Sequence, residues 1–522
     1  MKTSFTTHLA GILCCSTFLC AQPPLVQWQK SLGGNNWDDV SSVELTSDGG
    51  YIVAGSTASA DGDVAVNYGN WDCFLVKLNA SGAVQWAKNY GGSNNDYALS
   101  VKPTPDGGFI FVGPTDSNNN DVSGNHGAFD FWAVKTDGNG VIQWQKCLGG
   151  SFDDRATSVH VTADGGCIIA GYTSSTNGDV TGMQGWEDFW VVKLSAQGNL
   201  IWQKTLGGSS LDRAFSVSEK SDGSIIVAGY TYSTDGNVFG FQGGTADIWV
   251  VNLSPFGGSL IWQKCLGGNG NEEAFSIQNT SDGGYILAGG TESTAGQVTG
   301  NQGSQDFWVV KLNSLGSLVW QKTLGGSGQD IARCIKENQD GSFIVVGTTY
   351  SNNGDVTGNH GGGDIWAVKL GAGGNLIWQK CYGGSGQDVG FSMQQINNDD
   401  YIMVGTAWSN NGDITNPYSI NWPDIWVAQV TPNPLNMHDF DNSQLVVYPN
   451  PSKGSITLTF DYMQGSGLVK ICNTLGQQLG QKQISQFELP LTLDISSSAG
   501  LYLLHVFDNK GQLLGTKKIM VE

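Results

Sequence analysis

Apolar residues in this chain come in short runs, separated by turns rich in Gly, Asn, Asp and Ser. One representative stretch contains four such runs, at residues 154–161, 167–172, 188–194 and 200–206. The intervening segments have turn or loop composition and fall at residues 163–166, 174–187 and 195–199. Four short strands joined by tight turns predict one antiparallel sheet.

The second and third of these strands are apolar at almost every position. The third reads Asp-Phe-Trp-Val-Val-Lys-Leu at residues 188–194. A sheet with one solvated face would alternate more cleanly between apolar and polar residues, so this pattern indicates that both faces are covered. Such a sheet is typical of a propeller blade.

The fourth strand carries a Trp-x-Lys motif that returns with nearly fixed spacing. The steps are 58, 58, 58, 60, 58 and 58 residues, and the tryptophans are Trp28, Trp86, Trp144, Trp202, Trp262, Trp320 and Trp378. A repeat of this length buries its faces only by stacking on copies of itself. The sequence therefore predicts a repeat architecture over about 400 residues.

Two acidic positions recur in all seven units. One opens the third strand, at Asp72, Asp130, Asp188, Asp247, Asp306, Asp364 and Asp424. The other lies four residues after a Gly-Gly pair, at Asp38, Asp96, Asp154, Asp212, Glu272, Asp330 and Asp388. A catalytic acid needs one distinctive environment, so we interpret both sets, and the Trp-x-Lys lysines, as sources of turn hydrogen bonds and of ion pairs between blades.

The two ends of the repeat region predict a closed ring. The region begins with a lone fourth strand, residues 25–32, and ends after a third strand, residues 424–430. The surplus strand at one end supplies the strand missing at the other, and closure removes exposed sheet edges. We predict an all-β fold: a seven-bladed β-propeller closed by its N-terminal strand.

The repeat resembles a known bacterial family. The phrase Leu-Gly-Gly-Ser-x-x-Asp-x-Ala-x-Ser-Val, followed by Asp-Gly-Gly-Tyr-Ile-x-Ala-Gly-x-Thr, is similar to the SBBP-type β-propeller repeat over about residues 25–430. The resemblance implies a secreted propeller and no particular activity.

The C-terminal part breaks the period. Residues 431–444, with Pro432 and Pro434, read as a linker. Residues 445–522 contain Tyr-Pro-Asn-Pro, then Gly-Leu-Tyr-Leu, then a basic and apolar terminal strand. This tract resembles the type A C-terminal sorting domain of Bacteroidota type IX secretion cargo. The resemblance implies a small β-sandwich that binds the secretion machinery and is then removed, with the cargo released or attached to the cell surface.

Composition narrows the compartment and the partners. Lys2 and a short apolar stretch make residues 1–21 a predicted secretory signal peptide, and no other segment is long enough to span a membrane. The net charge of −21 argues against nucleic-acid partners. Three of the ten cysteines lie in the predicted signal peptide. The other seven are odd in number and lack metal-site spacing, so we expect buried free thiols. These features predict a secreted or outer cell-surface protein.

Most tryptophans are predicted to be structural. Thirteen of the eighteen lie in the Trp-x-Lys motif or two residues after the third-strand Asp. Each buries on the order of 150–250 Å² when it packs, which favours a role in core packing between blades. No nucleophile elbow, HExxH motif or P-loop is present in the sequence.

The long loop between the second and third strands holds the residues that differ between units. We predict a ligand-binding face there, formed by Trp71, Trp186 and Trp422 with Asp63, Asp179 and Asp355. An aromatic ring beside Asn and Asp suits a sugar, and oxygen-rich loops suit calcium, although Asn-Gly-Asp is also ordinary turn chemistry. His126 and His360 share one loop register in non-adjacent units, so we expect no shared metal site.

We therefore predict a secreted or surface binding or adhesion propeller, exported by the type IX pathway, whose ligand is an extracellular protein or a glycan. We expect no catalytic residues and no cofactor, with calcium left open. The alternative is an extracellular carbohydrate-active hydrolase or lyase that uses the central pocket of the propeller.

Overall fold

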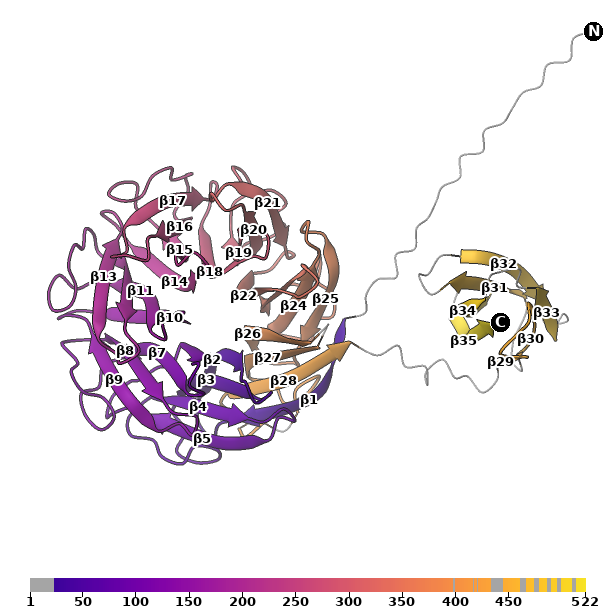
Figure 1. Ribbon diagram of the computed structural model, residues 1–522, viewed down its shortest axis with the longest axis horizontal. Coiled ribbons are helices and arrows are strands. Elements are labelled where there is room, and N and C mark those ends of the chain that lie inside the picture. Colours follow the sequence, from indigo (N-terminus) through magenta and orange to yellow (C-terminus); the bar gives the residue numbers. More distant parts are fainter. Residues whose placement is uncertain are drawn as a thin grey trace, which may run out of the picture. The chain divides into compact units, whose positions relative to one another are not determined.

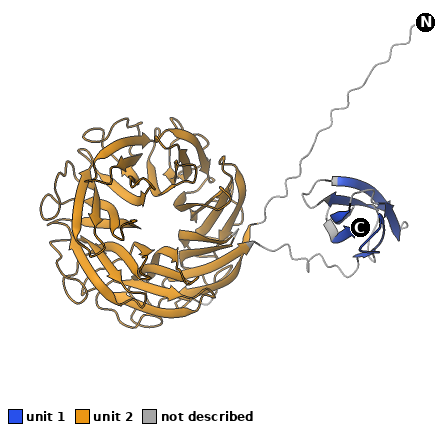
Figure 2. Cartoon of the chain, viewed as in Figure 1, with its two compact units in different colours: residues 1–21, 433–522 blue, residues 22–432 orange. Residues whose placement is uncertain are grey.

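The structure is a computed structural model that describes residues 23–397, 400–415, 417–419, 421–432, 445–460, 466–473, 478–485, 490–494, 499–508 and 513–522. The predicted signal peptide, residues 1–21, lies outside the described residues. The described chain falls into two compact units divided between residues 432 and 433 (Figure 2). The described residues form no helix that is long and apolar enough to cross a membrane.

The first unit is a ring of four-stranded antiparallel sheets (Figure 1), and seven such sheets occur among its described residues. We call them blades 1 to 7 in chain order. Blades 1 to 3 contain β2 (Asp38–Leu45), β3 (Tyr51–Thr57), β4 (Asp72–Leu78) and β5 (Val84–Tyr90); β6 (Ser100–Pro103), β7 (Phe109–Thr115), β8 (Asp130–Thr136) and β9 (Ile142–Leu148); and β10 (Asp154–Val161), β11 (Cys167–Thr173), β12 (Asp188–Leu194) and β13 (Leu200–Leu206).

The next three blades repeat this order. They contain β14 (Asp212–Glu219), β15 (Ile225–Thr231), β16 (Asp247–Leu253) and β17 (Leu260–Leu266); β18 (Glu272–Asn279), β19 (Tyr285–Thr291), β20 (Asp306–Leu312) and β21 (Leu318–Leu324); and β22 (Asp330–Glu337), β23 (Phe343–Thr349), β24 (Asp364–Leu370) and β25 (Leu376–Tyr382).

Blade 7 closes the ring with both ends of the repeat region. It combines β26 (Asp388–Asn397), β27 (Asp400–Ala407) and β28 (Asp424–Pro432) with β1 (Pro24–Leu32). The N-terminal strand pairs antiparallel with β28, from Pro24 opposite Pro432 to Leu32 opposite Ile425. The predicted all-β fold and its closure by the first strand are confirmed, and β28 runs two residues into the predicted linker.

The third strands form the core of the ring. Six of them carry a tryptophan with no exposed surface, and these are Trp132, Trp190, Trp249, Trp308, Trp366 and Trp426. The seven described cysteines are also buried and free, as predicted. Hydrophobic clusters join neighbouring blades, so the packing between blades forms one continuous circuit.

The Trp-x-Lys tryptophans lie on the outermost strands and pack against the hydrophobic clusters between blades, as predicted, but most of them are less buried than the third-strand tryptophans. All except Trp378 are half-buried, because one side of the outermost strand faces solvent. They do pack between blades as expected. Trp28 lies so close to Gly82 of the next blade that a Cβ at that glycine would come within 2.7 Å of its ring.

The first strand of each blade lies nearest the ring axis (Figure 1). Its inner edge would leave backbone N–H groups unpaired. Serines of the preceding blade accept several of these hydrogen bonds: Val159 N donates to Ser100 Oγ (3.3 Å), Val217 N to Ser158 Oγ (3.2 Å) and Ile277 N to Ser216 Oγ (3.0 Å). Neighbouring blades therefore satisfy each other's edges.

The second unit is a small β-sandwich. One sheet has the order β29-β30-β33 and the other β32-β31-β34-β35. Their inner faces share one core, which includes Leu445, Ile456, Val469, Leu504 and Ile519. The predicted β-sandwich is confirmed. The strands are β29 (Leu445–Tyr448), β30 (Ser455–Phe460), β31 (Ser466–Asn473), β32 (Gln478–Ser485), β33 (Leu491–Asp494), β34 (Gly500–Asp508) and β35 (Leu513–Val521).

Candidate ligand-binding surface

The acid that follows each Gly-Gly pair is a buried structural anchor. Asp154 is fully buried and accepts hydrogen bonds from Gly150 N (2.7 Å), Ser175 Oγ (2.8 Å) and the Thr173 hydroxyl. The same Gly N–H contact recurs at the equivalent acid of all seven blades. The predicted turn hydrogen bonds are confirmed for this set, and these acids are inaccessible to a ligand.

The Asp that opens each third strand is also buried. It lies close to the anchor acid of the next blade. Asp188 Oδ2 accepts a hydrogen bond from Gln184 N at 2.7 Å, whereas its Oδ1 is buried with no partner among the described residues. Burial, and the nearby carboxyl group of Asp212, raise the pKa of Asp188 to about 7. Gly207 lies between the two acids, and a Cβ there would come within 2.4 Å of Asp188 Oδ1.

The ion pairs involve a different lysine from the one predicted. Lys77, on the third strand of blade 1, pairs with Asp48 of the turn between the first two strands at 2.9 Å. The equivalent pairs are Lys135–Asp106, Lys193–Asp164, Lys311–Asp282 and Lys369–Asp340. In the described part of the chain, the Trp-x-Lys lysines form no ion pair, since their outer strands extend them toward solvent. These pairs also lie within one blade instead of between blades.

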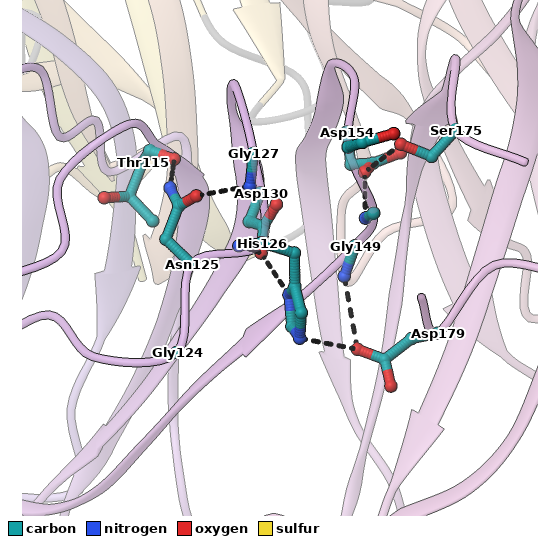
Figure 3. Close-up of polar contacts among 12 residues, drawn as sticks. Thr115, Gly124, Asn125, His126, Gly127, Asp130, Gly149, Asp154, Ser175 and Asp179 are labelled. Atoms are coloured by element: carbon teal, nitrogen blue, oxygen red, sulfur yellow. Dashed lines mark hydrogen bonds and ion pairs between the residues drawn. The ribbon is translucent and has the colours of Figure 1, made fainter. Parts of the chain in front are cut away.

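The predicted loop carboxylates lie at separate blade junctions. Asp179 Oδ2 accepts a hydrogen bond from Gly149 N (3.3 Å) and lies 4.0 Å from His126 Nε2 of the preceding blade (Figure 3). The other ring nitrogen of His126 lies 2.6 Å from Asp130 Oδ2. A loop side chain therefore links one blade to the acid of the next.

The same link recurs elsewhere in the ring. Gln302 Nε2 donates to Asp355 Oδ2 at 2.7 Å, between blades 5 and 6. At the junction of blades 7 and 1, burial raises the pKa of Tyr418 to about 12, and the hydrogen bond and charge of Asp63 make a further, smaller contribution. Asp63, Asp179 and Asp355 thus contact their neighbouring blades at three different junctions. Their role in ligand binding stays a prediction.

No metal centre is evident in the described ranges, where no three His, Cys, Asp or Glu side chains converge with suitable geometry. His126 and His360 each bond to the third-strand Asp of their own blade, with His360 Nδ1 2.7 Å from Asp364 Oδ2. Calcium binding stays a prediction.

Two of the three predicted tryptophans meet in one aromatic cluster at the junction of blades 7 and 1. Trp71 and Trp422 both contact Trp37, with ring centroids 6.2 Å and 6.0 Å apart. Trp408 contacts Trp37 edge-on at 5.1 Å. We call Trp37, Trp71, Trp408 and Trp422 the Trp cluster. Trp408 and Trp422 are 40% and 43% exposed, so the cluster offers ring surface to solvent.

Trp186, the third predicted tryptophan, lies apart from the cluster. It is 77% exposed, in the long loop of blade 3, and contacts no other aromatic ring of the described chain. Its backbone N donates to Ser210 O of blade 4 at 3.2 Å, so the loop itself is held in place.

Sequence reasoning missed Trp37 and Trp408. Subtracting the thirteen recurrent tryptophans from eighteen leaves five, and four of these form the Trp cluster. Trp37 precedes a first strand, outside the long loop, and Trp408 directly follows a second strand, at the start of that loop. The available signal was their failure to recur.

The cluster continues along the ring as an aromatic band. Trp71 contacts Tyr97 at 6.0 Å, and Tyr97 contacts Phe129 at 6.3 Å. The guanidinium of Arg155 lies 4.0 Å from the centre of the Phe129 ring, a cation–π contact. The band therefore leads from blade 7 across blades 1 and 2 to the first strand of blade 3.

The comparisons with known proteins identify the second unit. Residues 446–522 match the family model described as a secretion system C-terminal sorting domain. The chain carries this domain of the type IX system, which marks proteins for secretion or for attachment to the outer cell surface. None of the curated proteins compared with the chain matches it significantly.

Solved structures resemble the chain only weakly. PorZ, a type IX secretion component from Porphyromonas gingivalis, is 12% identical with a TM-score of 0.40, and the match covers 94% of this chain and 60% of PorZ. Sqt1 from Chaetomium thermophilum is 12% identical with a TM-score of 0.35, covering 72% and 97%. An acylaminoacyl peptidase from Pyrococcus horikoshii is 10% identical with a TM-score of 0.39, covering 81% and 57%. Scores of this size say nothing about what this chain binds.

Proposed function

We propose that this protein is a secreted or cell-surface binding protein whose propeller recognises a polysaccharide through the Trp cluster. The sorting domain at residues 446–522 accounts for its export. The observation that carries the proposal is the convergence of four of the five non-recurrent tryptophans on one junction, with two of them substantially exposed.

The chemistry of the cluster supports a sugar ligand. Exposed aromatic rings offer flat apolar surface against which the C–H faces of a sugar ring can stack, and a few polar groups then fix its orientation. Asn35 and Asn36 lie beside Trp37 and are exposed. The side chain of Asn35 bonds to Asp61, which holds this polar rim in place.

Burial of the perturbed acids favours binding over hydrolysis. A glycosidase needs two accessible carboxyl groups with different proton affinities. The acids with the largest rise in pKa are the third-strand Asp residues, which occur in all seven blades and are fully buried or nearly so. A substrate cannot reach them without opening the blade junctions.

A glycan array probed with the purified full chain tests the proposal. Trp422→Ala should weaken binding of any neutral or acidic glycan hit by up to roughly tenfold, because it removes a stacking contact of about 0.5–1.5 kcal/mol. Phe256→Ala, which removes an exposed ring from a turn of blade 4, is the matched control and should bind as the wild type does. An array without hits, or equal loss in both variants, would refute the proposal.

Export has its own test. Deleting residues 445–522 should abolish delivery to the cell surface and leave the propeller inside the cell envelope, since the deletion removes the whole sorting domain. Cell fractionation followed by immunoblotting measures the outcome. Normal surface delivery of the truncated chain would contradict this role.

A further inference from the structure

Arginine is scarce in this chain, and its placement is selective. The sequence has three arginines, Arg155, Arg213 and Arg333. All three lie on first strands, β10, β14 and β22, which surround the ring axis (Figure 1). Each is half-buried. In a chain of net charge −21, this concentrates guanidinium groups at the axis.

Two of the three arginines have carboxylate partners. Arg213 forms a two-pronged ion pair with Glu187, in which Nη2 lies 3.0 Å from Oε1, and its Nη1 lies 3.3 Å from the Tyr230 hydroxyl. Arg155 Nη2 lies 3.4 Å from Asp153 Oδ2. The protein thus compensates these two charges itself.

Arg333 is different. Its guanidinium lies 4.3 Å from the centre of the Phe275 ring, and it makes no hydrogen bond or ion pair with any described residue. Burial lowers its pKa, an effect that Glu273 partly offsets. The cation–π contact orients the guanidinium and leaves its N–H donors unused.

A second uncompensated cation lies three residues further along the same strand. Lys336 is half-buried and likewise lacks a hydrogen-bond or ion-pair partner among the described residues. Burial and the neighbouring charge of Lys102 lower its pKa. Three residues along a regular strand correspond to about 10 Å, and β22 has a register shift between Ala332 and Cys334, so Arg333 occupies a bulge. The two cationic residues therefore lie at different heights along the same inner strand.

Charged residues from other blades lie near Lys336. Lys102 of β6 forms an ion pair with Glu44 of β2. His160 of β10 has its pKa lowered to about 4, first by burial and then by Lys102 and Lys336. Since β22 lies across the ring from β10 (Figure 1), Lys336 and His160 interact across the axis. Lys102 and Lys336 together carry more charge than Glu44 balances, so this part of the axis is positively charged.

An uncompensated, partly buried cation destabilises a fold, so a pair of them on one strand indicates a ligand that supplies the opposite charge. We propose that the ring axis binds an acidic polysaccharide, whose carboxylate or sulfate groups lie against Arg333 and Lys336. This inference rests on the proposed function and extends it to a charged ligand. The spacing of the two cations favours a chain with repeated anionic groups over a single ion.

The aromatic band supports a saccharide as the carrier of these charges. It connects the Trp cluster to Arg155 through Tyr97 and Phe129, with stacking surface along the way. On the far side, Phe215 contacts Phe275 at 5.3 Å, and Phe275 carries Arg333. Sugar rings can stack on this surface while their anionic groups face the cations.

Calorimetric titration of the full chain tests the inference with four probes: oligogalacturonate, sulfated dextran oligomers, neutral dextran oligomers of similar length, and polyglutamate. We expect one of the two acidic sugars to bind at least tenfold more tightly than neutral dextran, and its chemistry identifies carboxylate or sulfate as the group. Arg333→Gln and Lys336→Met should each weaken that binding by tenfold or more. Lys264→Met, on an exposed outer strand, makes the same charge change away from the axis and should have no effect.

Two further readouts separate a ligand site from a structural role. Without ligand, Lys336→Met should melt at the same temperature as the wild type or higher, because it removes an uncompensated charge. The acidic sugar should also raise the pKa of His160, which NMR titration of its ring protons measures. A lower melting temperature of Lys336→Met, or an unmoved His160, would contradict the inference.

The outcomes distinguish this inference from the proposed function. Neutral dextran binding that depends on Trp422, with no preference for acidic sugars, would overturn the inference and leave the proposed function standing. Tighter binding of polyglutamate would overturn the saccharide class. Failure of every sugar to bind would overturn both.

Discussion

The junction between blades 7 and 1 shares its backbone contacts with the junction between blades 4 and 5 but not its side chains. Asp38 N donates to Pro423 O at 3.1 Å in the first, and Glu272 N donates to Ala246 O at 2.9 Å in the second. The residue before that acid is Trp37 in one and Asn271 in the other.

Two more positions differ in the same way. Trp422 and Trp408 at the first junction correspond to Thr245 and Tyr232 at the second. The recurrent buried acids and backbone contacts hold both junctions together, so the exposed side chains are free to vary. Variation on a constant frame is how a repeat protein acquires one distinctive surface without a new fold.

The largest expected effect concerns the frame, because seven buried acids act together. Burial raises the pKa of Asp72, Asp188, Asp247 and Asp424 to about 7, well above the ordinary value of 3.8. The folded state therefore binds more protons than the unfolded chain between about pH 4 and pH 7. Stability should fall as pH rises through this window and level off above it. Calorimetric melting at pH 5, 6.5 and 8 measures this trend.

His160 opposes the trend, since its lowered pKa makes the fold less stable as pH falls below 6.5. Burial also lowers the pKa of His505, so two histidines oppose seven acids. Asp188→Asn should melt higher than the wild type at pH 8, where the buried carboxylate is costly. A melting temperature that rises from pH 5 to pH 8 would contradict this account, and its further rise with added calcium would reveal a cation at the acids.

A smaller effect is expected from one anchor. Asp154→Ala leaves the N–H of Gly150 and the hydroxyls of Thr173 and Ser175 without their acceptor, which should cost about 3 kcal/mol of unfolding free energy. Trp422→Ala, at an exposed position of the Trp cluster, should cost less than about 1 kcal/mol. Urea denaturation compares the two. Equal losses would erase the distinction between frame and surface.

The smallest expected effect lies at the inner edge. Ser216→Ala removes the acceptor of Ile277 N and should cost about 1 kcal/mol. Ser209→Ala, at an exposed serine of the turn that precedes β14, is the control and should change stability little. If both variants unfold at the same urea concentration, the serines do not hold the inner edges.

Much of the frame was predictable from the chain. The Trp-x-Lys period and the buried strands recur with the period of the fold and predicted the stacked sheets. The lone fourth-strand copy at the N-terminus predicted how the ring closes. The role of Asp154 followed from its recurrence. The pairing of Lys77 with Asp48 did not, because both belong to the same blade and their proximity depends on how its strands fold back.

The candidate site was less predictable. Trp71 and Trp422 were found because they do not recur, but they lie 351 positions apart in the sequence. Trp37 and Trp408 also fail to recur, but nothing in the sequence shows that a residue before a first strand faces one after a second strand. Asp63, Asp179 and Asp355 were predicted to share one binding face but lie at three different junctions, because the sequence does not show which loops meet.

The sequence by itself determined the strands, the repeat, the closing strand and the sorting domain, since each rests on local pattern and on copies of one unit. Only the tertiary structure decided which unlike residues meet. Ring closure brings blade 7 against blade 1 and creates the Trp cluster, and it turns the first strands toward one axis, where Arg333 and Lys336 remain without partners. Periodicity fixes what the units share, whereas contacts between their differences depend on distances that no local pattern encodes.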